Sequence, residues 1–134
     1  MVVDTSALFA ILADEPERRV FIAAIEATEA RHLSAATLVE VSIVIEGRHG
    51  AEGLRDLDHF VASAGIDLVT VDAEQANVAR RAFSRYGKGR HRARLNYGDC
   101  FSYALAMVLS EPLLFKGDDF GHTDVEAVDF TSFS

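Results

Sequence analysis

The sequence predicts an α/β protein with a mostly parallel central sheet of four or five strands, flanked by helices on both faces. Short apolar runs such as "MVV" and "PLLF" alternate with longer amphipathic segments. Continuous apolar runs between helices are typical of parallel strands buried on both sides. The chain has 134 residues, of which 49% are hydrophobic, and this is the size of one compact domain. We therefore expect a single domain over residues 1–134.

The first half of the chain contains three helical patterns between strand-like runs. "MVVD" predicts a strand that leads into a helix over 5–15. Pro16 is at a first-turn position and predicts a second helix over 16–30. After a short strand at 31–35, a helix over 37–50 is expected to end at Gly47 or Gly50.

The second half continues the alternation. A helix over 51–65 has Gly65 as its stop signal, and "IDLVTVD" predicts a buried strand. Asp72 is expected to cap a helix that extends to Gly87. The polar stretch 88–98 shows no apolar period and predicts a loop. An amphipathic helix follows, then a strand at "PLLF" and a last short strand in "VEAVDF".

The charge is unevenly distributed. The formal net charge is -8, yet the 24 residues from Gln75 to Gly98 hold seven basic residues and no acid. These bases are Arg80, Arg81, Arg85, Lys88, Arg90, Arg92 and Arg94. Such asymmetry within one domain indicates a local anion-binding face, although a solvated helix face and loop would also explain it.

Two other features exclude classes of protein. The only cysteine, Cys100, forbids an internal disulfide and makes a poor zinc site, so we interpret it as a small buried hydrophobic residue. No stretch approaches the roughly 20 apolar residues of a membrane-spanning helix, and no basic leader precedes the early apolar run. We expect a cytoplasmic protein that does not enter a membrane.

Five acids fall where parallel strands or their following helices would bring them together. They are Asp4 after the first strand, Glu40 in the third helix, Asp99 at the start of the helix after the basic loop, and Asp118 with Asp119 after "PLLF". In open α/β sheets, ligands bind outside the carboxyl ends of the strands. Clustered carboxylates raise one another's pKa unless a cation lies between them, and oxygen-only ligands select Mg²⁺ or Mn²⁺.

Each of three acids also has a purely structural alternative. Asp99 and Asp4 are possible N-caps of the helices that follow them, and Glu40 is a possible capping-box partner of Thr37. Capping does not explain why the basic stretch runs directly into Asp99. An acidic metal site beside a basic rim instead indicates chemistry on a phosphodiester backbone.

Four blocks, "MVVDTSAL", "VE" near residue 40, "LNYGDCFSYALA" and "PLLFKGDDF", resemble the PIN-domain ribonucleases. More narrowly, they resemble the VapC toxins of type II toxin-antitoxin systems. The resemblance covers essentially the whole chain, with the blocks in the family's order. It implies a PIN-like fold and a Mg²⁺-dependent endoribonuclease, with Mn²⁺ as an alternative ion, that cuts RNA and so inhibits translation and growth.

The resemblance also implies which residues act. Asp4, Asp99 and Glu40 match the metal-binding acids, and Ser6 matches a hydroxyl position that supports Asp4. The fourth acid departs from the family pattern, because Phe115 stands at a hydroxyl-like position and Gly117 where an acid can occur. Asp118 or Asp119 substitutes for it; we take Asp118 as the fourth ligand and Asp119 as a supporting residue.

RNA contacts are expected beside this acidic site. Lys88, Arg90, Arg92 and Arg94 would position the backbone, because phosphate contacts give affinity more than sequence choice. Tyr86, Tyr97 and His91 have the chemistry to stack on unpaired bases, although packing is the alternative for Tyr97. The resemblance further implies a VapB-type antitoxin whose tail docks between the helices near Thr5, Pro16 and Thr37, and a homodimer.

Two other classes compete with this reading. A phospho-accepting receiver domain would use Asp72 and Lys116, but such domains place an acidic pair after the first strand, where this chain has Thr5 and Ser6. A catalytically inactive PIN-type domain that binds RNA or a protein partner is the other alternative. The presence of Asp4, Glu40 and Asp99 together argues against it.

Overall fold

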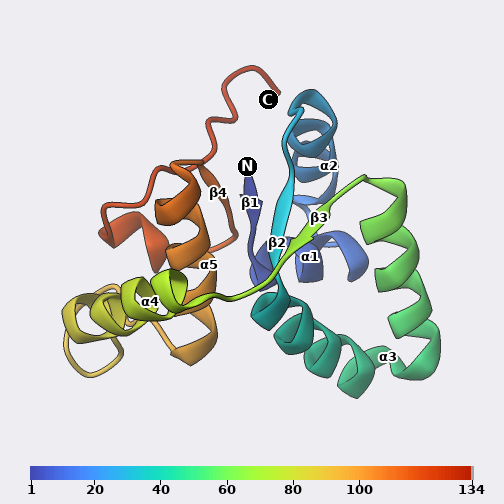
Figure 1. Ribbon diagram of the computed structural model, residues 1–134. Coiled ribbons are helices and arrows are strands. Elements are labelled where there is room, and N and C mark those ends of the chain that lie inside the picture. The colour runs from blue at the N-terminus through green and yellow to red at the C-terminus, as the bar shows by residue number, and fades with distance from the viewer. Residues whose placement is uncertain (134) are drawn as a thin grey trace.

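The computed structural model describes residues 1–133 and places a parallel sheet between two groups of helices (Figure 1). Across these residues the sheet has four strands in the order β3-β2-β1-β4: β1 (Val2–Val3), β2 (His32–Ser34), β3 (Asp67–Val69) and β4 (Leu113–Leu114). All three pairings are parallel. The expected fifth strand near the C-terminus is reduced to one bridge between Leu113 and Ala127. The predicted fold class is confirmed.

The helices cover both faces of the sheet. They are α1 (Thr5–Leu12), α2 (Arg18–Ala27), α3 (Ala35–Ser63), α4 (Ala73–Tyr86) and α5 (Tyr97–Leu109), followed by the short 3-10 helix η1 (Phe120–His122). In Figure 1, α1, α2 and α3 lie on one side of the strands, and α4 and α5 lie on the other. Parallel strands require such coverage because both of their faces are apolar.

Successive strand residues point to the two opposite cores. Val2 and Leu113 pack with α4 and α5, whereas Val3 and Leu114 pack with α1, α2 and α3. All four side chains are completely buried. This alternation follows from the period of two along a strand. The parallel pairing of Val3 with Leu114 places the carboxyl ends of β1 and β4 side by side.

Two elements differ from the sequence-based expectation. Pro16 lies in a turn, and α2 begins two residues later at Arg18. The break expected at Gly47 or Gly50 is confirmed at Gly50, where φ is 64° and ψ is -156°, so that α3 consists of two helices joined at a kink. The stretch at 66–72 is not a buried strand: Leu68 of β3 is 53% exposed, because β3 lies at the edge of the sheet and is paired on one side only.

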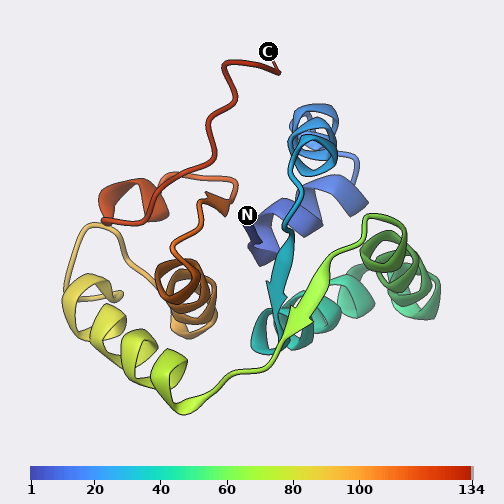
Figure 2. The ribbon, with the colours of Figure 1, turned by 45° about the horizontal axis from the view of Figure 1, so that its top comes forward.

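The segment after η1 leaves the edge of the sheet and ends near α2 (Figure 2). The Phe130 ring packs against Phe21 of α2, with 5.6 Å between the ring centroids. This contact ties the end of the chain to the core on the α1–α3 side. Within residues 1–133, no helix combines the length and the apolar character that crossing a bilayer requires.

Candidate active site

Asp4 directly follows β1 and is the N-cap of α1. Its Oδ2 accepts hydrogen bonds from the Ser6 backbone N–H at 3.0 Å and from Ser6 Oγ at 2.7 Å. Ser6 Oγ in turn accepts the Lys116 N–H at 2.9 Å, which links this cap to the chain after β4. Asp4 is only 2% exposed, and its Oδ1 has no hydrogen-bond partner in residues 1–133. The cap therefore uses one carboxylate oxygen and leaves the other free for a ligand.

Glu40 does not take part in a helix cap. Ser34 is the N-cap of α3, and the Thr37 hydroxyl is paired with Ser102 Oγ at 3.1 Å, so the capping box expected between Thr37 and Glu40 does not form. Glu40 Oε1 instead accepts a hydrogen bond from the Thr5 hydroxyl at 2.5 Å. Burial, together with the charge of Asp4, raises the pKa of Glu40, and the Thr5 hydrogen bond opposes this shift.

The backbone of α5 lies directly against the Glu40 carboxylate. A Cβ atom built on Gly98 would lie 1.8 Å from Glu40 Oε2 and 2.6 Å from Oε1. Only glycine permits this approach. Glu40 is thus held between the Thr5 hydroxyl of α1 and the first turn of α5, where backbone N–H groups favour negative charge.

Asp99 lies one residue further along α5. Asn96 is the N-cap of this helix, and Asp99 completes a capping box by accepting the Asn96 N–H through Oδ2 at 3.0 Å. Burial raises the pKa of Asp99 to about 7, against the lowering effect of the Asn96 hydrogen bond, and the charges of Asp4, Glu40 and Asp119 raise it further. Asp99 is therefore a helix-capping residue and also a member of a carboxylate cluster.

The clustered acids lie in surroundings that disfavour their negative charge. Burial, and to a lesser extent the charges of neighbouring acids, raises the pKa of Glu40 and Asp99, and Asp4 Oδ1 is buried without a hydrogen-bond partner in residues 1–133. These are the properties of oxygen ligands that bind a hard divalent cation. In residues 1–133 no three acidic, histidine or cysteine side chains are arranged to ligate an ion all at once. A divalent cation at this site would therefore have few direct protein ligands and would keep several of its waters, as Mg²⁺ prefers.

The structure separates the two acids after β4. Asp118 is exposed, whereas Asp119 is half-buried, and its charge contributes to the raised pKa of Asp99. Of these two acids, only Asp119 is among the groups that raise the pKa of Asp99. The choice of Asp118 as the fourth ligand stays a prediction. Lys116 points to other partners, with its Nζ 3.1 Å from Glu15 Oε1 and 3.2 Å from Glu17 Oε1.

The predicted RNA-contacting residues lie in the loop between α4 and α5. Lys88, Arg90, Arg92 and Arg94 are all exposed. The loop backbone is tied to the end of α4 by the Leu95 N–H to Tyr86 carbonyl bond at 3.0 Å, and within itself by the Lys88 N–H to Leu95 carbonyl bond at 2.9 Å. The four bases thus stand on an anchored loop that runs into the helix carrying Asp99.

Sequence reasoning missed Thr5, Asn96 and Gly98. The Asn-x-x-Asp spacing of residues 96–99 is a capping-box signature and was a usable signal for Asn96. Thr5 and Gly98 acquire their roles only through contact with Glu40 from another element. Asp72, the phosphoacceptor in the receiver-domain alternative, caps α4 by accepting the Gln75 N–H at 2.9 Å.

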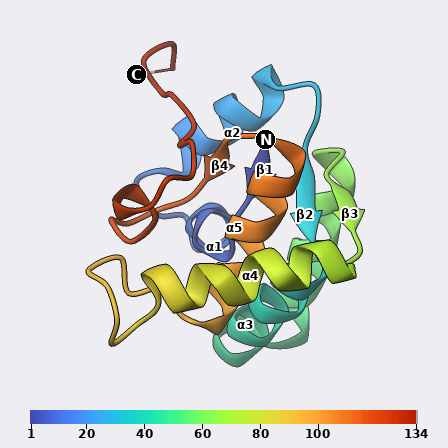
Figure 3. The same ribbon diagram turned by 60° about the vertical axis from the view of Figure 1, so that its left-hand side comes forward.

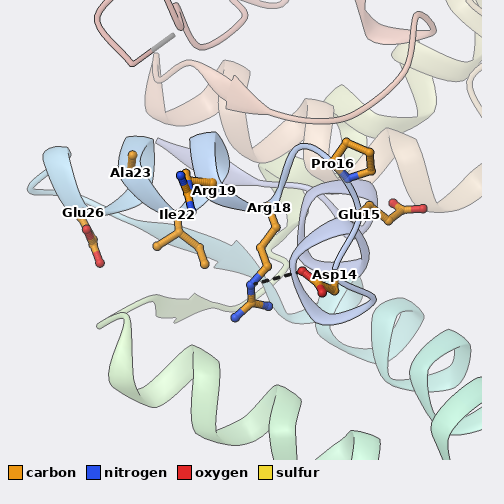
Figure 4. A pocket seen from close by; sticks show the side chains of 8 residues that line it. All are labelled: Asp14, Glu15, Pro16, Arg18, Arg19, Ile22, Ala23 and Glu26. Carbon is orange, nitrogen blue, oxygen red and sulfur yellow. Dashed lines mark ion pairs between the residues drawn. The ribbon is translucent and has the colours of Figure 1, made fainter.

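A pocket of about 610 Å³ lies elsewhere, at the junction of α1 and α2 (Figure 4). Figure 4 shows Arg18 of α2 extending across to Asp14, and their nearest charged atoms are 3.9 Å apart. Arg18 also donates to the Ile11 carbonyl at the end of α1. None of the clustered carboxylates lines this pocket, so it is a separate feature of the surface.

Fold and site together define a class of protein. A parallel α/β sheet with carboxylates from three elements converging near the ends of its strands, together with excess negative charge, is the arrangement of a hydrolase that depends on a divalent metal. The exposed basic loop that leads into α5 suits a polyanionic substrate.

Comparison with known proteins agrees with this class. The PIN domain profile matches residues 1–126. Ribonuclease VapC30 of Mycobacterium tuberculosis is 56% identical over 128 residues, which cover 96% of this chain and 98% of that protein. The solved structure of Mycobacterium tuberculosis VapC20, described as a sarcin-ricin loop cleaving toxin, has a TM-score of 0.76 at 18% identity and covers 95% of this chain and 97% of its own. The chain belongs to the PIN-domain family, among the VapC ribonucleases.

A third similarity is to a toxin-antitoxin complex from Klebsiella pneumoniae. It has a TM-score of 0.68 at 19% identity, and the match covers 95% of each chain. At this identity the similarity concerns the fold alone. It shows that the arrangement of strands and helices seen here also occurs in a protein solved within such a complex.

Replacing Gly98 with alanine is expected to reduce RNA cleavage about 100-fold while leaving the fold at least as stable. The new methyl group would overlap the Glu40 carboxylate, which is the flexible end of a side chain and would swing away from the cluster. Alanine also favours a helix over glycine by about 0.5–1 kcal/mol. Cleavage rates and thermal unfolding measure the two effects.

Gly47→Ala is the matched control for this experiment, because a Cβ at Gly47 of α3 meets nothing within 4 Å. It should leave cleavage unchanged. Equal rates for the two variants would show that the close approach of Gly98 does not position Glu40.

Proposed function

We propose that this chain is the toxin of a type II toxin-antitoxin pair and that it hydrolyses RNA phosphodiester bonds with bound Mg²⁺, thereby inhibiting translation and growth. The observation that carries the proposal is the electrostatic coupling of Asp4, Glu40 and Asp99, which come from different parts of the chain, together with a buried Asp4 Oδ1 that has no hydrogen-bond partner in residues 1–133. The 56% identity to a VapC ribonuclease over nearly the whole chain supports RNA as the substrate. We place the protein in the cytoplasm, where such a substrate occurs.

The proposed roles follow from the geometry. Asp4 Oδ1 and Asp99 would hold the ion, and Glu40, fixed by Thr5 and Gly98, would contact it directly or through a water. Asp119, whose charge acts on Asp99, is the fourth acid that we now favour over Asp118. When bound, Mg²⁺ supplies activation of a water for in-line attack on phosphorus and stabilises charge on the phosphoryl oxygens; Mn²⁺ would supply the same chemistry.

The remaining residues bind and orient the substrate. Lys88, Arg90, Arg92 and Arg94 would neutralise phosphates that flank the scissile one, and backbone hydrogen bonds anchor the loop that carries them. Ser6 would keep Asp4 in place through its two hydrogen bonds. These contacts position the RNA without selecting its sequence.

A VapB-type antitoxin is the proposed protein partner. The similarity to a chain from a toxin-antitoxin complex supports this, as does membership of the VapC ribonucleases. The pocket of Figure 4 is lined by the turn after α1 and by α2, and it includes Pro16, which is near one of the three helices between which we expect the antitoxin tail. Homodimer formation remains a prediction from the family resemblance.

The function is tested by cleavage of total cellular RNA and of structured RNA transcripts with Mg²⁺, with Mn²⁺ and with EDTA. We expect cutting only with metal, and Asp99→Asn should lower the rate by about 10²- to 10³-fold because a ligand charge is lost. Asp58→Asn, an exposed acid in α3, is the control and should cut normally. Metal-independent cutting, or full activity of Asp99→Asn, would refute the proposal.

A further inference from the structure

A second pocket, of about 430 Å³, lies between α4 and α5 on the opposite helix layer from the pocket of Figure 4. Its walls are aromatic side chains, namely Phe83 of α4 with Tyr97 and Phe101 of α5, together with small residues. One cationic side chain, Arg80, also lines it. In Figure 3, α4 crosses in front of α5, and the two helices pack against each other. The pocket is therefore a mainly apolar recess of a size that accommodates a planar ring.

Tyr97 is the unusual member of this lining. It is 79% exposed, which is the largest exposed fraction among the exposed large hydrophobic side chains of residues 1–133. Its ring meets Phe101 edge to face, with 5.0 Å between centroids and 77° between planes. Packing of the core does not require Tyr97, because so much of its surface faces solvent. An exposed aromatic ring beside an apolar recess is a platform for a ligand that stacks.

The pocket begins at the turn of α5 that also carries Asp99. Tyr97, Cys100 and Phe101 are spaced by three and four residues and present one face of α5 to the pocket, whereas Gly98 of the same turn faces Glu40 of the carboxylate cluster. A nucleotide whose phosphate lies at the cluster would therefore have a neighbouring base within reach of the recess. Unpaired bases stack on aromatic side chains in many complexes with single-stranded RNA.

Cations continue the same surface on the far side of the pocket. Arg80 lines both the pocket and an adjoining polar groove, together with Asn77, Arg81 and Ser84. The Arg90 guanidinium carbon lies 5.7 Å from the centroid of the Phe83 ring. Carboxylates, an aromatic recess and an arginine-lined groove thus follow one another along α5 and α4. A nucleotide has a flat base, which suits the aromatic recess, and a negatively charged phosphate, which suits the arginines.

We propose that the α4–α5 pocket binds one unpaired nucleobase of the RNA next to the scissile phosphate. Tyr97 is the stacking platform, and Arg80 contacts the phosphate that follows the base. This inference rests on the proposed RNA-cleaving function and adds a site at which the enzyme selects single-stranded over paired substrate. Tyr97 increases the affinity for RNA by stacking on the base, whereas Arg80 increases it by contacting the phosphate backbone.

The test measures binding without cleavage, in the Asp4→Asn protein with Mg²⁺ present. The probes are a fluorescein-labelled oligoadenylate and an abasic ribose-phosphate chain of equal length and charge, followed by fluorescence anisotropy. Tyr97→Ala should weaken oligoadenylate binding about tenfold, since stacking contributes about 1–3 kcal/mol per base. It should leave binding of the abasic chain and the salt dependence unchanged, and Tyr97→Trp should restore the affinity.

Two further variants complete the design. Arg80→Gln should weaken binding of both chains and reduce the salt slope by about 1, as loss of one phosphate contact does. Leu68→Ala, which removes an exposed apolar side chain on β3, is the control and should change neither. Analytical ultracentrifugation of each variant reports its oligomeric state.

Three results would overturn the proposal: equal weakening of both chains by Tyr97→Ala, no weakening of either, or conversion of a dimer into a monomer by this change. The last result would assign the pocket to contact with a second copy of the chain. Failure here is distinct from failure of the proposed function. Metal-dependent cleavage that is lost in Asp99→Asn would stand even if Tyr97 had no effect on binding.

Discussion

Asp4→Asn is expected to lower the rate of RNA cleavage by about 10²- to 10³-fold while the protein stays folded. The change keeps the size of the side chain, and the remaining carbonyl oxygen can still accept the Ser6 N–H that starts α1. It removes a buried negative charge from a cluster in which Asp4 raises the pKa of both Glu40 and Asp99. The variant therefore loses a cation ligand and also relieves repulsion in the metal-free protein.

Asp72→Asn is the matched control for this prediction. Asp72 is also the N-cap of a helix, α4, and its Oδ1 accepts the Gln75 N–H at 2.9 Å, but it is not among the groups that act on the clustered acids. Initial cleavage rates and circular dichroism of the two variants separate capping from catalysis. If both lost activity to the same extent, the effect would lie in helix capping, and the assignment of Asp4 would fail.

The stability of the metal-free protein is expected to fall as the pH rises from about 4 to about 7. Burial and three neighbouring acids raise the pKa of Asp99 from 3.8 to about 7. Within that window the folded protein retains a proton that the unfolded chain has released, so the free energy of unfolding decreases with pH. We expect a loss of about 2 kcal/mol, which is half the full value for three pKa units because Asp99 is partly exposed.

Urea unfolding in EDTA at a series of pH values measures this decline. Asp99→Asn should flatten the curve, and Mg²⁺ should oppose the decline in the wild type, because the ion binds the deprotonated acids. The pKa of Glu111 is lowered, so its contribution to stability is lost as the pH falls below about 4.5. This effect lies below the pH range in which Asp99 changes the stability, and the two can be told apart. A wild-type curve that stays level or rises from pH 4 to 7 would contradict the prediction.

Local patterns predicted most of the elements because their signals lie within a few residues. Asp72 caps α4 and Gly65, with φ of 62°, follows the end of α3, as the sequence indicated. The sequence-based predictions fail where contacts with other parts of the chain determine the structure. Leu68 has the apolar character of a buried strand residue but lies on the edge strand β3, and Pro16 resembles a helix start but lies in a turn.

Some candidate site residues could likewise be identified from local sequence, whereas others could not. The position of Asp4 after an apolar run already placed it at a strand end, and the basic stretch before Asp99 singled out that acid. The choice between Asp118 and Asp119 was not available from sequence, because both lie in one short exit loop. In the structure this loop packs through Phe115 and Phe120 against the core formed with α4 and α5, and the charge of Asp119 is among those that raise the pKa of Asp99.

By itself, the sequence determined an alternating α/β chain, acids at strand ends and a basic stretch before one of them, since each is a matter of residue type and spacing. The tertiary structure decided which acids share one electrostatic environment, why Gly98 precedes Asp99, and that Tyr97 borders a recess between α4 and α5. These features depend on contacts between helices far apart in the chain. No local pattern of residues records such contacts.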